Sequence, residues 1–163
     1  MHMKRLILNL DICSACPQCV IACSYYYHPG NKGIDRLREL VTYALVCRRC
    51  EYGTCVQACP VEALERDSTG VLSRYSMRCI GCGSCAHACP FGTIYLDLLP
   101  YQLSGCDLCR DRALRELPLC VRTCPYGALG YLEVEEDKEK GVYLVDDGIA
   151  VISHHWARHK IQP

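Results

Sequence analysis

The sequence predicts an α+β fold in which short helices and β-hairpins surround cysteine-rich loops. Three observations carry this prediction. The 163 residues include 16 cysteines but only one Phe and one Trp, so the apolar core is small for the chain length. All 16 cysteines fall into four groups of four. The segments between the groups are short, with the apolar alternation and glycine-containing turns of strands and hairpins.

The third group has the most regular spacing. Residues 79–90 carry four cysteines separated by two, two and three residues, and Pro90 follows the last. This is the bacterial run for a [4Fe–4S] cluster, in which the fourth cysteine ligates a neighbouring cluster. Gly81 and Gly83 let the backbone bend closely around a bulky core, and Pro90 ends the helix that begins at Cys85.

The other groups repeat this pattern with changes. The first keeps the spacing but has Ser24 in place of the proline, and the middle gap is four residues in the second group. In the fourth group the gap is ten residues, Arg110 to Leu119, which predicts a short helical insertion. The segments after Pro60, Pro90 and Pro125 are alike, which indicates an internal repeat. The groups are Cys13, Cys16, Cys19 and Cys23; Cys47, Cys50, Cys55 and Cys59; Cys79, Cys82, Cys85 and Cys89; and Cys106, Cys109, Cys120 and Cys124.

The elements before the second group follow from local composition. Arg5 to Leu10 alternates apolar and polar residues and predicts a strand. The spacing predicts a short helix over Val20 to Tyr27. His28 to Gly33 is rich in turn residues and predicts a break. Leu40 to Val46 is β-branched and aromatic and predicts a strand.

Two hairpins are predicted further along the chain. Ala63–Arg66 and Val71–Arg74 flank a loop that ends in glycine, and Val142–Val145 and Ile149–Ile152 flank Asp-Asp-Gly. The charge run Glu133–Lys140 predicts a solvated loop.

Disulfides and zinc are the alternatives to clusters. A secreted disulfide scaffold does not require four regular groups, and no signal peptide is evident at the N-terminus, where Met1–Met3 has the form of a cloning remnant. Structural zinc usually takes two well-separated Cys-x2-Cys pairs, whereas these groups all end in Cys-x3-Cys. A [3Fe–4S] site arises when one cysteine is replaced, but all 16 are present. The sequence therefore predicts four [4Fe–4S] clusters with the 16 cysteines as iron ligands. His154, His155 and His159 lack partners at suitable spacing and predict a surface tail.

Charge and hydropathy limit the partners. Four clusters on 16 thiolates would bring the formal charge from zero to about −8. No basic tract predicts a nucleic-acid partner, and no apolar run approaches the length of a membrane span. The expected location is cytoplasmic, with export on a partner's signal as the alternative.

With these four groups, the chain resembles the four-cluster ferredoxin-like electron-transfer subunits of multisubunit oxidoreductases. These subunits accompany molybdenum or tungsten enzymes, hydrogenases and carbon monoxide dehydrogenases. The resemblance covers residues 6 to about 132, and the irregular second and fourth groups carry it, because two-cluster ferredoxins lack them.

The resemblance implies two bacterial-ferredoxin-like modules, one inserted in the other. The outer module would comprise residues 1–40 and 100–163 with the C-terminal hairpin, and the inner module residues 41–99. The short hairpin between the second and third groups supports the inner pairing independently, whereas the outer pairing rests on the resemblance alone. The implied ligand sets are Cys13, Cys16, Cys19 and Cys124; Cys106, Cys109, Cys120 and Cys23; Cys47, Cys50, Cys55 and Cys89; and Cys79, Cys82, Cys85 and Cys59.

The expected function is electron transfer without catalysis. The sequence has no glycine-rich nucleotide loop, no Ser–His–Asp candidate and no catalytic metal motif. Closed, numerous clusters suit a relay of single electrons between a catalytic subunit and a second redox partner, a flavoprotein or ferredoxin. The expected catalytic partner is a tungsten or molybdenum aldehyde or formate oxidoreductase in an anaerobic host. A hydrogenase or carbon monoxide dehydrogenase, a free polyferredoxin carrier and a zinc-stabilised interaction module are the alternatives.

Five arginines stand beside ligand cysteines in the sequence. One hypothesis is that some of them offset the negative charge of the clusters and raise their reduction potentials. The alternative is ordinary surface arginine. The five are Arg48, Arg49, Arg78, Arg110 and Arg122.

Overall fold

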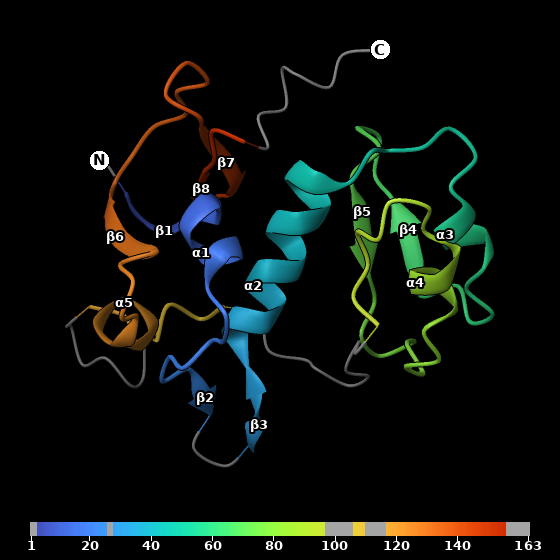
Figure 1. Cartoon of the computed structure of the whole chain (residues 1–163), viewed down its shortest axis with the longest axis horizontal. Helices are drawn as coiled ribbons and strands as arrows, with labels where there is room; N and C mark the ends of the chain where they lie inside the picture. Colours follow the sequence, from blue (N-terminus) through green and yellow to red (C-terminus); the bar gives the residue numbers. More distant parts are fainter. Residues whose placement is uncertain (1–2, 26–27, 97–105, 110–116, 156–163) are drawn as a thin grey trace. The chain divides into compact units, whose positions relative to one another are not determined.

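The computed structural model describes residues 3–25, 28–96, 106–109 and 117–155 (Figure 1). The chain divides into two compact units. The outer unit comprises residues 1–35 and 105–163, and the inner unit comprises residues 36–104. Short helices and strands are mixed in both units, which confirms the predicted α+β class. None of the described helices is long and apolar enough to cross a membrane.

The outer unit contains a four-stranded mixed sheet in the order β6-β1-β8-β7 (Figure 1). Strand β1 (Lys4–Asn9) pairs antiparallel with β6 (Leu129–Glu133) and parallel with β8 (Ile149–Ile152). Strand β7 (Val142–Asp146) forms a hairpin with β8. The predicted N-terminal strand and terminal hairpin are therefore confirmed, and the first strand in sequence lies inside the sheet.

The sheet is stabilised by a small buried core and by hydrogen bonds to one carboxylate. Leu8, Tyr143 and Val151 are fully buried. Asp11 of α1 (Leu10–Ala15) accepts hydrogen bonds from the Ser153 hydroxyl at 2.9 Å and the His154 N–H at 2.7 Å. Burial alone would raise the pKa of Asp11, but these bonds hold it below its usual value. These two hydrogen bonds connect the first helix to the residues that follow β8.

The segment after α1 differs from the prediction. The expected helix over residues 20–27 is absent from its described part, because Ser24–Tyr25 forms strand β2 with β3 (His28–Lys32). The predicted break at His28 is thus a strand. The Ala22 N–H donates to the Thr123 hydroxyl at 2.9 Å instead of to a helical carbonyl. Long-range bonding therefore replaces the helical pattern here.

The inner unit contains most of a helix whose last part lies in the segment predicted as a strand. Helix α2 (Gly33–Val41) continues into a π-helical turn, η1 (Thr42–Val46). The strand predicted for Leu40–Val46 is therefore wrong. Buried apolar residues recur at helical spacing, and this periodicity overrides β-branched propensity. They are Ile34, Leu37, Val41 and Leu45.

The predicted hairpin between the second and third groups is confirmed. Strands β4 (Leu64–Arg66) and β5 (Leu72–Arg74) pair antiparallel. The Asp67 carboxylate accepts N–H bonds from Thr69 at 2.8 Å and Val71 at 2.9 Å, which closes the loop. Both hairpin arms lead directly into cysteine groups.

Cysteines form a large part of the inner core. Tyr43, Leu64, Leu72 and Ile94 pack with the buried Cys55 and Cys85. Three further cysteines, Cys47, Cys59 and Cys89, pack against this cluster. A core with so few aliphatic side chains is only marginally stable by itself. The clusters predicted to bind these cysteines would therefore contribute to the free energy of folding.

The remaining predictions concern the second half of the chain. The insertion predicted between Arg110 and Leu119 falls mostly on residues 110–116, outside the described residues. Helix α5 (Leu119–Thr123) begins at its end. The charged segment Glu133–Lys140 is mostly exposed, as predicted.

Candidate iron–sulfur sites

The cysteine loops repeat a backbone conformation as well as a sequence. In the Cys-x2-Cys loops of the second, third and fourth groups, the third residue has a left-handed backbone. These residues are Arg49, Gly81 and Leu108, with φ of 53°, 69° and 54°. A left-handed residue turns the chain sharply, which lets both cysteines of the loop face one centre.

A second left-handed position follows the last cysteine of the same groups. Three residues after that cysteine stand Glu62, Gly92 and Gly127, with φ of 50°, 63° and 63°. Between the two positions, α3 (Thr54–Gln57), α4 (Ser84–Ala88) and α5 each begin one residue before the third cysteine. The internal repeat is thus a repeat of turn, short helix and turn.

The left-handed positions predict opposite effects of two substitutions. Gly92→Ala should destabilise the inner unit by about 1 kcal/mol, because an added Cβ at Gly92 meets nothing within 4 Å and only the backbone penalty remains. Glu62→Gly should stabilise it by up to about 1 kcal/mol by releasing the same strain. Urea unfolding of the anaerobic cluster-loaded protein would measure both. Equal signs for the two variants would contradict this account.

All 16 cysteines are free, so the disulfide alternative fails. Several sulfurs accept hydrogen bonds. The Ala63 N–H donates to Cys59 Sγ at 3.2 Å and the Thr93 N–H donates to Cys89 Sγ at 3.4 Å, at equivalent places in the repeat. Burial would raise the pKa of Cys89, but the N–H groups of Thr93 and Phe91 bring it below its usual value. Donors of this kind stabilise thiolates.

The most exposed of these cysteines has a hydroxyl neighbour. Cys82 Sγ lies 3.3 Å from the Ser84 hydroxyl, and this contact lowers the pKa of Cys82. The other 15 cysteines are buried or half-buried, whereas Cys82 is exposed. The third group therefore reaches the surface at this sulfur.

Sulfurs from different groups lie near one another in the inner unit. Burial raises the pKa of Cys55, and the nearby charges of Cys47 and Cys89 raise it further. Burial likewise raises the pKa of Cys85, with Cys59 and Cys79 as its charged neighbours. Each neighbourhood combines sulfurs of one group with the last cysteine of the other.

In the outer unit, too, a cysteine of one group lies near cysteines of another group. Burial raises the pKa of Cys120 to about 12, and the charges of Cys23, Cys106 and Cys109 contribute. Cys23 comes from the first group and the others from the fourth. The last set lies on α1, the loop after it and the end of α5, and its convergence stays a prediction. It comprises Cys13, Cys16, Cys19 and Cys124.

The donor chemistry fits [4Fe–4S] clusters. Within the described ranges, no group of three or more His, Cys, Asp or Glu side chains lies close enough to hold a single metal ion. The neighbourhoods offer sulfur donors on glycine-containing loops, with backbone N–H groups directed at some sulfurs. Thiolate ligation with hydrogen bonds to sulfur is the environment that holds and tunes such clusters.

The arginines selected from the sequence make mainly surface contacts. Arg48 stacks on Phe91 at 5.6 Å, and Arg49 donates to the carbonyls of Thr69 and Ala44. Arg78 pairs with Glu65 at 3.2 Å. Arg122 is exposed near the end of α5, and Arg110 lies outside the described residues.

Two other arginines approach the cysteine loops, and sequence adjacency missed both. Arg66, at the end of β4, donates from Nη1 to the Cys50 carbonyl, and its charge acts on Cys55. Arg74, at the end of β5, hydrogen-bonds Cys79. Both arginines lie on the predicted hairpin between two cysteine groups, and this position could have indicated them from the sequence.

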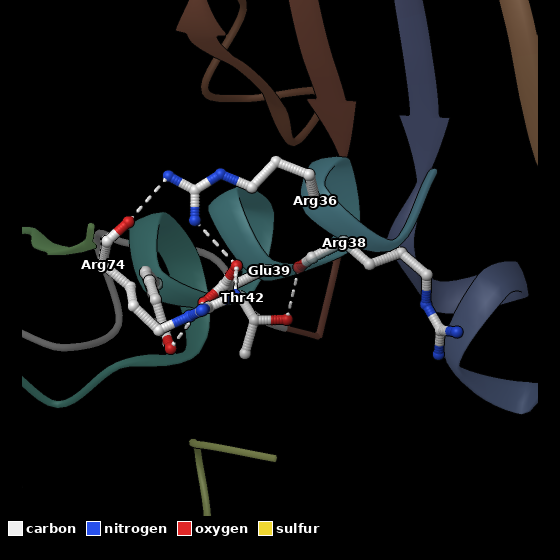
Figure 2. Close-up of polar contacts among 6 residues, drawn as sticks. Arg36, Arg38, Glu39, Thr42 and Arg74 are labelled. Atoms are coloured by element: carbon white, nitrogen blue, oxygen red, sulfur yellow. Dashed lines mark hydrogen bonds and ion pairs between the residues drawn. The ribbon is translucent and has the colours of Figure 1, made fainter. Parts of the chain in front are cut away.

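Arg74 belongs to a buried network centred on Glu39, which is 3% exposed (Figure 2). Arg74 donates to this carboxylate from Nε at 2.5 Å and from Nη2 at 3.0 Å. Arg36 donates to it at 2.7 Å and the Tyr43 hydroxyl at 3.0 Å. Burial opposes ionisation of Glu39, but the Arg74 and Arg36 contacts hold its pKa below the usual value. The carboxylate is therefore charged at neutral pH.

The other side chains of this helix face have different partners. The Thr42 hydroxyl donates to the Arg38 carbonyl at 2.8 Å and contacts the Tyr95 hydroxyl at 3.2 Å. Figure 2 shows the Arg38 guanidinium pointing away from Glu39. Burial, with Glu39 nearby, raises the pKa of Tyr43 far above its usual value, so its hydroxyl stays a donor.

Comparison with known proteins agrees with this chemistry. A family described as "4Fe-4S dicluster domain" matches residues 39–134, and one described as "4Fe-4S binding domain" matches residues 10–26. The thiosulfate reductase electron transfer subunit PhsB of Salmonella typhi is 32% identical over 142 residues, which cover 77% of this chain and 73% of that protein.

Two further relatives are similar over most of their length. The B subunit of the polysulfide reductase of Wolinella succinogenes is 30% identical over 150 residues, 83% of this chain and 78% of that protein. An uncharacterized ferredoxin of Methanocaldococcus jannaschii is 34% identical over 136 residues, 83% of this chain and 76% of that protein. These matches favour iron–sulfur clusters over zinc. The chain belongs to the ferredoxin-like [4Fe–4S] electron-transfer subunit family, with 16 cysteines for four [4Fe–4S] clusters.

Proposed function

We propose that this protein is the electron-transfer subunit of an oxidoreductase complex and is not catalytic by itself. When bound, the clusters supply one-electron redox centres. The observation that supports the proposal is the proximity of cysteines from different groups, since the charge of Cys89 acts on Cys55 and that of Cys23 acts on Cys120. Sets completed by protein thiolates leave no iron open to substrate, which suits relay rather than catalysis.

We also propose how the 16 ligands are shared. Electrostatic proximity supports the grouping of several members in three of the four sets that the family resemblance implies, and the fourth set rests on the resemblance alone. The division of the chain into a continuous inner unit and a discontinuous outer unit supports two modules, one inserted in the other. The proposed sets are Cys47, Cys50, Cys55 and Cys89; Cys79, Cys82, Cys85 and Cys59; Cys106, Cys109, Cys120 and Cys23; and Cys13, Cys16, Cys19 and Cys124.

The catalytic partner is proposed from the names of the relatives. Two of them are named as subunits of thiosulfate and polysulfide reductases, so a reductase of oxidised sulfur compounds is our first candidate. The names give no support to the aldehyde or formate oxidoreductase expected from the sequence. A flavoprotein or ferredoxin as the second redox partner and a cytoplasmic location stay predictions.

Anaerobic purification from native cells tests this function. We expect a stable complex, with about sixteen iron and sixteen acid-labile sulfide per copy of this chain, and molybdenum or tungsten in the same fraction. Viologen-driven turnover with thiosulfate or polysulfide should exceed turnover with aldehyde or formate. Zinc without sulfide would overturn the cluster assignment, and a monomer with full iron and sulfide would identify a free carrier.

A further inference from the structure

The β4–β5 hairpin places Arg66 beside the second cysteine group and Arg74 beside the third. The strands pair Leu64 with Arg74 and Arg66 with Leu72, so the two arginines lie at opposite ends of the hairpin. Arg66 contacts the segment between Cys50 and Cys55, and Arg74 contacts Cys79. The hairpin therefore places one positive charge beside each of two similar loops.

The two arginines differ in what neutralises them. Arg74 is 2% exposed in its side chain and bonds the Glu39 carboxylate through two nitrogens. Arg66 has no carboxylate among the contacts that the described residues show. Its Nε is buried and has no hydrogen-bond partner within the described part of the chain. An unmet buried N–H of this kind is unfavourable unless an acceptor is present.

The position of Arg66 indicates which acceptor would meet that N–H. The guanidinium lies 3.2 Å from where a Cβ on Gly53 would stand, so it packs closely on the backbone of that glycine. Gly53 stands between Cys50 and Cys55, inside the loop of the second group. Cluster sulfide and ligating thiolate are the hydrogen-bond acceptors that a [4Fe–4S] site supplies at such a loop.

The other charged residues at the second and third loops also differ. Arg48 and Arg49 also belong to the second loop. Beside the third loop, Arg78 is paired with Glu65, with side chains 53% and 51% exposed. Carboxylates also stand at the second loop, where Glu51 follows Cys50 and the charge of Arg49 acts on Asp67. The difference between the two loops therefore rests on Arg66, which contacts no carboxylate in the described part of the chain, and Arg74, which is paired with Glu39.

We propose that Arg66 raises the reduction potential of the cluster held by Cys47, Cys50 and Cys55. This cluster is therefore reduced before the one held by Cys79, Cys82 and Cys85. Reduction adds one negative charge, and an unneutralised cation with a free N–H stabilises that charge more than a cation shared with a carboxylate. The inference rests on the proposed function and gives the two inner sites a fixed order.

A potentiometric titration followed by electron paramagnetic resonance tests this order on the full anaerobic cluster-loaded chain. Signals are assigned by their loss in Cys55→Ala and Cys85→Ala. In the unmodified protein the Cys55-dependent signal should be reduced first. Arg66→Gln should lower the reduction equilibrium constant of that cluster at least tenfold, which is 59 mV for one electron. Arg66→Lys keeps the charge but loses the Nε donor and should give a smaller shift.

Arg48→Gln is the matched control, because Arg48 is an exposed arginine of the same loop. It should shift the potential less than Arg66→Gln does. Equal shifts in both variants, an unchanged potential in Arg66→Gln, or reduction of the Cys85-dependent cluster first would overturn the inference. If Arg66→Gln loses its cluster, the order in the unmodified protein and the Arg66→Lys shift decide. Iron and sulfide contents far below sixteen in the unmodified protein would instead refute the proposed function.

Discussion

The double variant Cys120→Ala/Cys124→Ala should damage two clusters, whereas Cys23→Ala/Cys120→Ala should damage only one. Cys120 and Cys124 belong to the same motif, but the proposed sets assign them to different clusters. Cys23 and Cys120 come from different motifs and lie near each other. Loss of two thiolates from one set should release that whole cluster, about four of sixteen iron atoms. Iron analysis and electron paramagnetic resonance of anaerobic protein would measure these outcomes.

The inner unit provides the matched pair. Cys55→Ala/Cys89→Ala should again remove one cluster, and Cys55→Ala/Cys59→Ala should damage two. If each motif instead held its own cluster, the two classes of double variant would exchange their results. This reversal would disprove the sharing of cysteines while leaving four clusters in place.

Glu39→Gln should destabilise the inner unit by about 3–5 kcal/mol. The groups that hydrogen-bond this carboxylate within the described residues are all donors, so a glutamine amide would turn a donor toward a donor. Removing one partner of a buried ion pair leaves the other charge poorly compensated. The urea midpoint of the cluster-loaded protein would measure the loss.

Glu65→Gln is the control, because it removes a carboxylate from an exposed pair on the same hairpin. Its effect should be below about 1 kcal/mol. Comparable losses in the two variants would show that the buried network has no special role in stability.

The network also fixes a pH dependence. The pKa of Glu39 is lower in the folded protein than its usual value of about 4.3. Its contribution is therefore complete above the unfolded pKa and is lost as pH falls through the folded pKa. Between pH 6 and 8, Glu39 should contribute no change in stability, and pH titration of the urea midpoint of Glu39→Gln against the parent would show this.

The cysteine spacing predicts the ligand loops of the candidate site because iron–sulfur chemistry restricts such loops. Short loops must present several thiolates to one centre, so the spacing, the glycines and the prolines are all local in sequence. The strand at Lys4–Asn9 and the two hairpins could be predicted for the same reason, since alternation and turn residues are local features.

The rest depends on contacts between distant residues. Glu39 and Arg74 are 35 residues apart, and no local pattern indicates that one neutralises the other. The segment Leu40–Val46 carries β-branched residues, yet its buried positions continue the face of α2. Arg66 stands outside every cysteine motif, so proximity in sequence directed attention to surface arginines instead.

The topology of the outer sheet has a consequence for synthesis on the ribosome. Strand β1 is made before the inner unit, but it lies between β6 and β8, and Ser153 bonds Asp11 across 142 residues. The inner unit is one continuous segment that is complete before β6 exists. It can fold and acquire its metal while the outer strands still wait for their partners. Maturation should thus proceed from the middle of the chain outward, and arrested nascent chains that expose residues up to 104 outside the ribosome should already hold half of the iron.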